Sequence, residues 1–114
     1  MTLDWQDKVV VVTGGGGGMG QSVAKRFADA GAMTYVLGRT MASLEESSSL
    51  SEKITPIICD VADAESVAKA MQEIGTPDTL IHTAGINTPD RFMGHEDPDK
   101  VASAESWERV MDIN

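Results

Sequence analysis

The sequence predicts an α/β fold built on a parallel sheet, because three signals follow one another near its start. Residues 8–13, KVVVVT, form a nearly unbroken apolar run, as expected of a strand buried on both faces. Five glycines follow at 14–18, and an amphipathic helical pattern then runs from about Met19 to Ala30. A second apolar strand comes at 33–37. Strand, glycine turn, helix and strand in this order are typical of a βαβ unit.

The rest of the chain continues the alternation of helices and strands. We expect a weak helix at 41–51, a strand at 54–59, a helix from Asp63 to Gly75, a strand at 79–83 and a last helix from about Ser103. Pro56 cannot donate a ladder hydrogen bond and is confined to edges, strand starts or bulges, so it supports an order in which the third strand is an edge. The expected architecture is a four-stranded parallel sheet of order 3-2-1-4 flanked by helices. This is half of a doubly wound, Rossmann-like domain, with residues 1–114 forming a single domain.

Composition argues against several classes of function. The 114 residues carry a net charge of −9, which repels the phosphate backbone of nucleic acids. No apolar run approaches the roughly 20 residues that span a membrane, and the first residues lack a signal-peptide pattern. Cys59 is the single cysteine, and the sequence has no Cys and His cluster with zinc spacing. We therefore expect a cytoplasmic protein without a metal site, and neither nucleic acid nor a membrane as its partner.

The glycine turn has the composition of a phosphate-binding site. Glycine permits the backbone angles of a tight turn and lets an anion approach the main chain. The next helix would begin close to the strand, so that its unpaired N–H groups and positive dipole end face the anion. A flexible loop is the alternative. The position between a buried strand and an amphipathic helix favours phosphate binding.

The spacing Thr13-Gly14-x-x-x-Gly18-Met19-Gly20 resembles the fingerprint of the short-chain dehydrogenase/reductase family. The resemblance covers essentially the whole chain, which corresponds to about the first half of a typical family member. It implies a fold that binds NAD(P)(H) in an oxidoreductase. The implied cofactor-binding residues in the turn and at the ends of the third and fourth strands are Gly14, Gly16, Gly18, Met19, Gly20, Asp60, Val61, Thr83, Ala84 and Gly85. Asp60 also suits capping of the next turn, and the two roles are compatible.

The fourth strand and the last helix carry further matches and one departure. The family's Asn-Asn-Ala-Gly motif reads His82-Thr83-Ala84-Gly85 here, so the double asparagine is not matched. We interpret His82 as a hydrogen-bonded core residue rather than an acid–base group. The long polar stretch 86–102 is expected to be a loop beside the ligand crevice. The final VMDIN resembles the family helix that carries a catalytic asparagine, which implies Asn114 as that residue.

Arg39 and Thr40, directly after the second strand, bear on the choice of cofactor. An acidic residue there would hydrogen-bond the adenosine ribose of NAD, whereas a guanidinium pairs with the 2′-phosphate of NADP. The family shows the same contrast. Arg39 therefore favours NADP(H) over NAD(H), and an ordinary surface arginine is the alternative.

The residues that complete hydride transfer in the family are not found in this sequence. By resemblance, a serine and a Tyr-x-x-x-Lys pair follow the position of Asn114. Tyr35 is the only tyrosine, and Arg39 rather than lysine comes four residues later. In a strand this spacing is roughly 13 Å, too far for the two side chains to act as a pair. We expect Tyr35 to pack in the sheet and the 114 residues to lack catalysis on their own.

Three functions follow from these observations. The first is the cofactor-binding portion of a short-chain oxidoreductase that favours NADP(H). The second is a free-standing dinucleotide-binding module or sensor. The third is an assembly fragment that uses the apolar edge of the fourth strand, TLIHT, for self-association or for a complementing chain. The glycine turn, Arg39 and Asp60 favour the first two over the third.

Overall fold

The computed structural model describes residues 4–83, 108 and 111–112. The chain divides into two compact units, residues 1–84 and residues 85–114. Of the second unit, only Glu108, Met111 and Asp112 are described, and all three are helical. The predicted loop at 86–102 and the start of the last helix lie outside the described residues. The expectation of a single domain over 1–114 stays a prediction.

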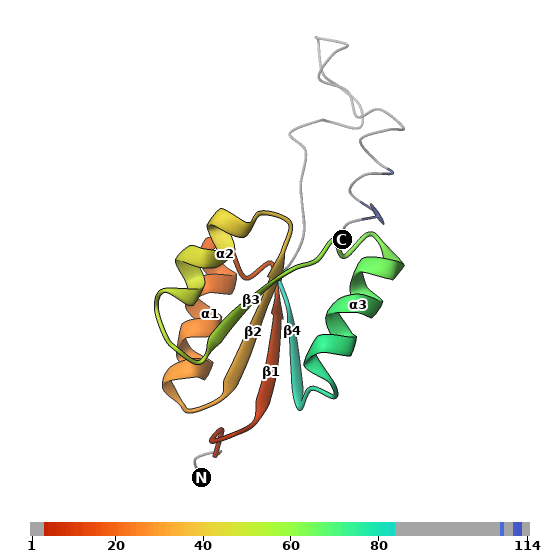
Figure 1. The fold of residues 1–114 in the computed structure, drawn as a ribbon. Helices are drawn as coiled ribbons and strands as arrows, with labels where there is room; N and C mark the ends of the chain where they lie inside the picture. The colour runs from red at the N-terminus through yellow and green to blue at the C-terminus, as the bar shows by residue number, and fades with distance from the viewer. Residues whose placement is uncertain (1–3, 84–107, 109–110, 113–114) are drawn as a thin grey trace, which may run out of the picture. The chain divides into compact units, whose positions relative to one another are not determined.

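The first unit contains a four-stranded parallel sheet in the order β3-β2-β1-β4, which confirms the predicted topology (Figure 1). The strands are β1 (Val9–Thr13), β2 (Met33–Gly38), β3 (Ile54–Ile58) and β4 (Thr79–His82). In the register of the sheet, Val12 of β1 lies between Val36 of β2 and Ile81 of β4. Pro56 lies in the edge strand β3, where a missing N–H is tolerated.

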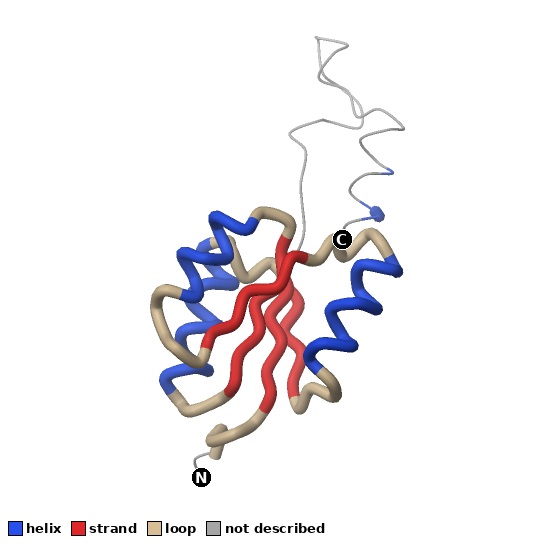
Figure 2. The backbone as a smooth tube through the Cα atoms, in the orientation of Figure 1, coloured by secondary structure: helices blue, strands red, loops and turns tan. Residues whose placement is uncertain are grey.

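Helices cover both faces of this sheet (Figure 2). Helices α1 (Gly18–Asp29) and α2 (Met41–Ser48) lie on one face, and α3 (Ala64–Ile74) lies on the other. The buried core on the α1–α2 face consists of Val10, Val12, Ala24, Ala28, Ala32, Val36, Leu44 and Ile54. The buried core on the α3 face consists of Val11, Leu37, Ile57, Cys59 and Ala70. Side chains alternate between the faces of a strand, so β1 is apolar throughout because both of its faces are covered.

The helix ends follow the expected signals, with small shifts. Gly31 and Gly75 have φ angles of 101° and 84°, and each follows the helix that it ends. The Asp63 carboxylate accepts a hydrogen bond of 3.0 Å from the Glu65 N–H and caps α3. The helix expected at 41–51 ends earlier, at Ser48. Hydroxyl groups at this end bond to backbone carbonyls one turn back, which competes with helix continuation.

Candidate functional site

The glycine turn lies where the carboxyl ends of the strands meet. Hydrogen bonds extend the ladders just past the strand ends: Gly14 N–H donates to the Leu37 carbonyl at 2.8 Å, and Cys59 N–H to the Gly38 carbonyl at 2.8 Å. Across the other neighbour, Thr83 N–H donates to the Thr13 carbonyl at 3.1 Å. The residues that directly follow β1, β2, β3 and β4 therefore lie together at the carboxyl end of the sheet. Ligand sites in open α/β sheets lie at this end.

Close packing makes glycine necessary in this turn. Gly14 has a φ angle of 70°, which residues with a Cβ rarely adopt. A Cβ at Gly20 would overlap the Gly14 carbonyl and come within 2.9 Å of the Gly15 Cα. A Cβ at Gly16 would lie 2.8 Å from the Ser43 Cβ. The turn is thus a tightly packed strand-to-helix connection, not a flexible loop.

The turn leaves backbone donors unused at the start of α1. Gly17 is the N-cap residue and provides no side-chain cap, and the first turn of the helix contains no acidic residue. Within residues 4–83, the N–H groups of Gly16, Gly18 and Met19 donate to no protein acceptor. Such donors, together with the positive end of the helix dipole, form an anion site. The predicted role of the turn therefore has the donors that it needs.

A cavity of about 290 Å³ connects the turn with the end of β2. Its lining comes from the turn, the β2–α2 connection and the first turns of α2: Gly14, Gly16, Gly17, Gly38, Arg39, Thr40, Ser43 and Leu44. Arg39 is exposed and forms no ion pair with the described residues. The cavity therefore combines one unused main-chain donor, the Gly16 N–H, with the Arg39 guanidinium, and each can face an anionic group. It brings together four predicted site residues, namely Gly14, Gly16, Arg39 and Thr40.

Four residues of this cavity were not predicted as site residues, namely Gly17, Gly38, Ser43 and Leu44. Ser43 and Leu44 lie on α2, whose packing against the turn brings Ser43 close to Gly16. The sequence contains a helical signal here, but it does not show which face of a weakly amphipathic helix meets the turn. Gly38 and Gly17 were visible in the sequence as parts of the strand end and of the glycine run.

Other predicted site residues lie outside this cavity. Gly18, Met19 and Gly20 belong to the first turn of α1, and Met19 is 75% exposed. Asp60 holds the turn after β3, because its carboxylate accepts from the Ala62 N–H at 3.0 Å. This is the capping role that we considered for it. The placements of Asp60, Val61 and Thr83 at the strand ends agree with a cofactor role but do not test it. Ala84, Gly85 and Asn114 lie outside the described residues.

His82 differs in part from the expectation. Its Nδ1 lies 2.7 Å from Thr13 Oγ1, so the predicted hydrogen bonding is confirmed. However, His82 is exposed and not in the core. The reason is its position, since β4 is an edge strand among the described residues and pairs only with β1. The Thr83 hydroxyl also donates to the Thr13 carbonyl, which ties β4 to the residue before the glycine turn.

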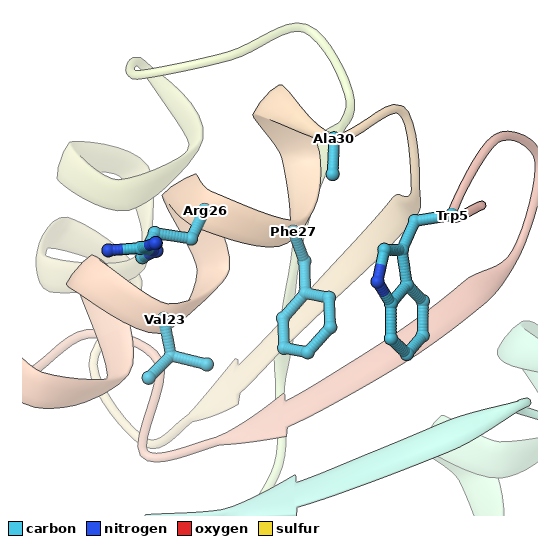
Figure 3. A pocket seen from close by; sticks show the side chains of 5 residues that line it. All are labelled: Trp5, Val23, Arg26, Phe27 and Ala30. Carbon is cyan, nitrogen blue, oxygen red and sulfur yellow. The ribbon is translucent and has the colours of Figure 1, made fainter. Parts of the chain in front are cut away.

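A second cavity, of about 370 Å³, lies beside α1 (Figure 3). It is lined by Trp5, Val23, Arg26, Phe27 and Ala30. Trp5 and Phe27 form an edge-to-face pair with ring centroids 4.8 Å apart, and both pack against the core. The Arg26 guanidinium extends away from the two rings. This cavity contains no part of the glycine turn, so the cavity beside Arg39 is the better candidate for an anionic ligand.

No group of three or more His, Cys, Asp or Glu side chains within the described residues is arranged to hold a metal ion. None of the described helices has the length and apolar character needed to span a bilayer.

Sequence comparison identifies relatives of the chain. Residues 8–114 match the family described as short chain dehydrogenase. The short-chain reductase protein NovJ of Streptomyces niveus is 33% identical over 117 residues, covering 96% of this chain and 42% of NovJ. The cis-2,3-dihydrobiphenyl-2,3-diol dehydrogenase of Rhodococcus globerulus is 37% identical over 86 residues, covering 71% of this chain and 31% of the enzyme. The chain spans less than half the length of these curated relatives.

Solved structures show the same fold. A short chain dehydrogenase from Bacillus anthracis matches with a TM-score of 0.79 and 32% identity, covering 93% of this chain and 44% of that protein. The 3-ketoacyl-(acyl-carrier-protein) reductase from Brucella melitensis, complexed with NADH, matches with a TM-score of 0.79 and 24% identity. That match covers 96% of this chain and 45% of the reductase and is a likeness of fold.

Proposed function

Because the chain belongs to the short chain dehydrogenase family, we propose that it binds NADP(H) in preference to NAD(H), as the cofactor-binding portion of an oxidoreductase. The residues present fit such a group. A side chain at Gly15, Gly16 or Gly20 would overlap neighbouring atoms, and the turn offers unused N–H donors to a pyrophosphate. When bound, a nicotinamide cofactor supplies or accepts a hydride. The proposed role of the chain itself is to bind and orient the dinucleotide.

The preference for NADP(H) depends on one observation, the place of Arg39. Arg39 lines the cavity that the glycine turn also lines, and the first residue of the strand-to-helix connection after β2 is this cation rather than a carboxylate. A guanidinium attracts a 2′-phosphate and forms paired hydrogen bonds with it, while a carboxylate would repel it. Thr40 and Ser43 add hydroxyl groups to the same wall. The lining of this cavity thus favours a ribose that carries a phosphate.

We also propose that residues 1–114 alone do not transfer hydride. The only tyrosine in these residues is Tyr35, in β2. Tyr35 is half-buried and packs against the core on the α3 face. A side chain held in this way has no access to the cavity beside Arg39, so it cannot act as a proton donor there.

Calorimetric titration with NADP(H) and NAD(H) tests the proposal when the wild-type chain is compared with Arg39→Asp. We expect tighter binding of NADP(H) by the wild type and a loss of about 10-fold to 100-fold in the variant, the effect of hydrogen bonds to a charged group. Arg26→Asp is the matched control. It makes the same charge change on an exposed arginine outside the Arg39 cavity, so it should leave the preference unchanged.

The possible outcomes separate the parts of the proposal. Equal binding of both cofactors, unchanged in Arg39→Asp, would leave dinucleotide binding intact and contradict the role of Arg39. Binding of neither cofactor would contradict the whole proposal.

A cytoplasmic location, which was expected from the single thiol, stays a prediction.

A second function is favoured by the exposure of β4. We propose that a second copy or a complementing chain covers the edge of β4 that faces away from β1, which has no partner strand among the described residues. Leu80 in β4 is 59% exposed, and none of the four residues of the strand is buried. Apolar edge strands of this kind support association through strand pairing.

A further inference from the structure

One buried side chain reaches the glycine turn from a distant part of the sequence. Ser47 lies in α2 and has no exposed surface. Its hydroxyl donates a hydrogen bond of 2.5 Å to the carbonyl oxygen of Gly15, which lies 32 residues earlier. Within residues 4–83, the other hydrogen bonds of residues 14–20 join backbone groups. Buried polar groups of this kind usually have a specific partner, and here the partner is part of the candidate site.

The turn is held on two sides. On the β2 side, the N–H groups of Gly14 and Gly15 both donate to the Leu37 carbonyl, at 2.8 and 3.2 Å. On the α2 side, the Ser47 hydroxyl holds the Gly15 carbonyl, and Ser43 packs against Gly16. The peptide between Gly15 and Gly16 is therefore fixed by a hydrogen bond on its carbonyl side, while its N–H side has no protein acceptor within residues 4–83.

The direction of that N–H follows from the geometry of the peptide. A trans peptide is planar, and its C=O and N–H groups point in opposite directions. With the Gly15 carbonyl directed at buried Ser47, the Gly16 N–H points away from Ser47. Gly16 lines the cavity beside Arg39, where the dinucleotide is proposed to bind. If the carbonyl lost its partner, rotation of this peptide could present an oxygen to an anion in place of a donor.

We infer that Ser47 is a positioning residue for the pyrophosphate: it orients the peptide between Gly15 and Gly16 so that the Gly16 N–H serves as an anion donor. The inference rests on the proposed dinucleotide binding and adds to it a residue that does not touch the ligand. It concerns the pyrophosphate end of the site. The Arg39 end, which determines the preference for a 2′-phosphate, should not depend on Ser47.

This difference between the two ends provides the test. We would titrate ¹⁵N-labelled full chain with NADP⁺, with inorganic pyrophosphate and with adenosine 2′-monophosphate, which lacks a pyrophosphate. The variants are Ser47→Ala, which removes the donor, and Ser47→Thr, which retains a hydroxyl. Ser48→Ala is the matched control, because the Ser48 hydroxyl donates to the Glu45 carbonyl within α2 at 3.0 Å. Each variant is first shown to be folded by its amide spectrum.

We expect Ser47→Ala to bind NADP⁺ and pyrophosphate about 10-fold more weakly, since a hydrogen bond to a charged group is misaligned. The shift of the Gly16 amide on pyrophosphate addition should be lost. Binding of adenosine 2′-monophosphate should stay unchanged, as should all binding by Ser48→Ala. Recovery of pyrophosphate binding in Ser47→Thr would further support the inference.

Two results would overturn the inference while leaving the proposed function in place. One is unchanged binding of NADP⁺ by folded Ser47→Ala. The other is an equal loss for all three ligands, which would indicate a general structural role. If the wild-type chain binds none of the three ligands, this inference and the proposed function both fail. If Ser47→Ala does not fold, the test is the shift of the Gly16 amide on pyrophosphate addition in the wild type and in Ser47→Thr. The absence of this shift in both would overturn the inference.

Discussion

The two sides of β1 differ in how completely they are covered. Toward β2 and β3, the sheet is covered by α1 and α2, and Val36, Leu44 and Ser47 have no exposed surface. On the other side of β1 lies β4, which has only four residues. None of them is buried, and Leu80 is 59% exposed. The candidate site lies on the covered side. Its geometry therefore depends on packing already present in the described residues, whereas the outer edge of β4 has no partner strand among them.

The largest effect is expected where the covered side is most densely packed. Leu44→Ala should lower the free energy of unfolding by about 2–5 kcal/mol, because it leaves a cavity between α2 and the sheet. Leu50→Ala is the control, since Leu50 is 41% exposed and its truncation should change stability by less than about 0.5 kcal/mol. Urea unfolding of both variants measures the difference. Equal effects would mean that α2 does not pack as described.

A smaller effect on stability, but a complete effect on binding, is expected in the glycine turn. A Cβ at Gly20 overlaps the backbone of Gly14 and Gly15, so Gly20→Ala should destabilise the chain by about 1–3 kcal/mol and abolish dinucleotide binding. The matched control for stability is Gly18→Ala, since a Cβ at Gly18 meets no atom within 4 Å. It should stabilise the chain by about 0.4–1 kcal/mol through the unfolded state. Retained binding in Gly20→Ala would argue against the turn as the pyrophosphate site.

Local signals were sufficient to predict the fold. The glycine run, Pro56, Asp63 and the apolar strands each act through backbone conformation or through burial of nearby residues. Together they indicated the doubly wound fold class, and the strand order 3-2-1-4 came from that class. The Arg39 end of the site was also predictable, because a residue directly after a strand remains near the end of that strand. Such positions follow from local chain geometry alone.

The contacts of α2 could not be predicted in the same way. In the sequence, Ser47 is one of three consecutive serines and appears only as a poor helix former. Its contact with Gly15 depends on the rotation of α2 about its axis, which is set by packing between segments 32 residues apart. The exposure of His82 has a similar cause. Its hydrogen bond to Thr13 is fixed by the strand register, but its exposure follows from the place of β4, which pairs only with β1 among the described residues.

The smallest effect on stability is expected at Leu80, which provides the sharpest test of the difference between the two sides. If the β4 side is open in the monomer, Leu80→Ala should change the free energy of unfolding by less than about 0.5 kcal/mol, in contrast to Leu44→Ala. Its effect should appear in association instead. Leu80→Lys places a charge beside the free edge, which opposes strand pairing, so sedimentation equilibrium should show weaker self-association than for the wild type.

Leu50→Lys is the control for a general change in surface charge and should not alter the association. A wild-type chain that is monomeric at every concentration would contradict self-association and leave a complementing chain as the partner of β4. A large loss of stability in Leu80→Ala that grows with protein concentration would contradict an open β4 side. It would mean that Leu80 is buried between copies of the chain, and that contacts at β4 stabilise the assembly.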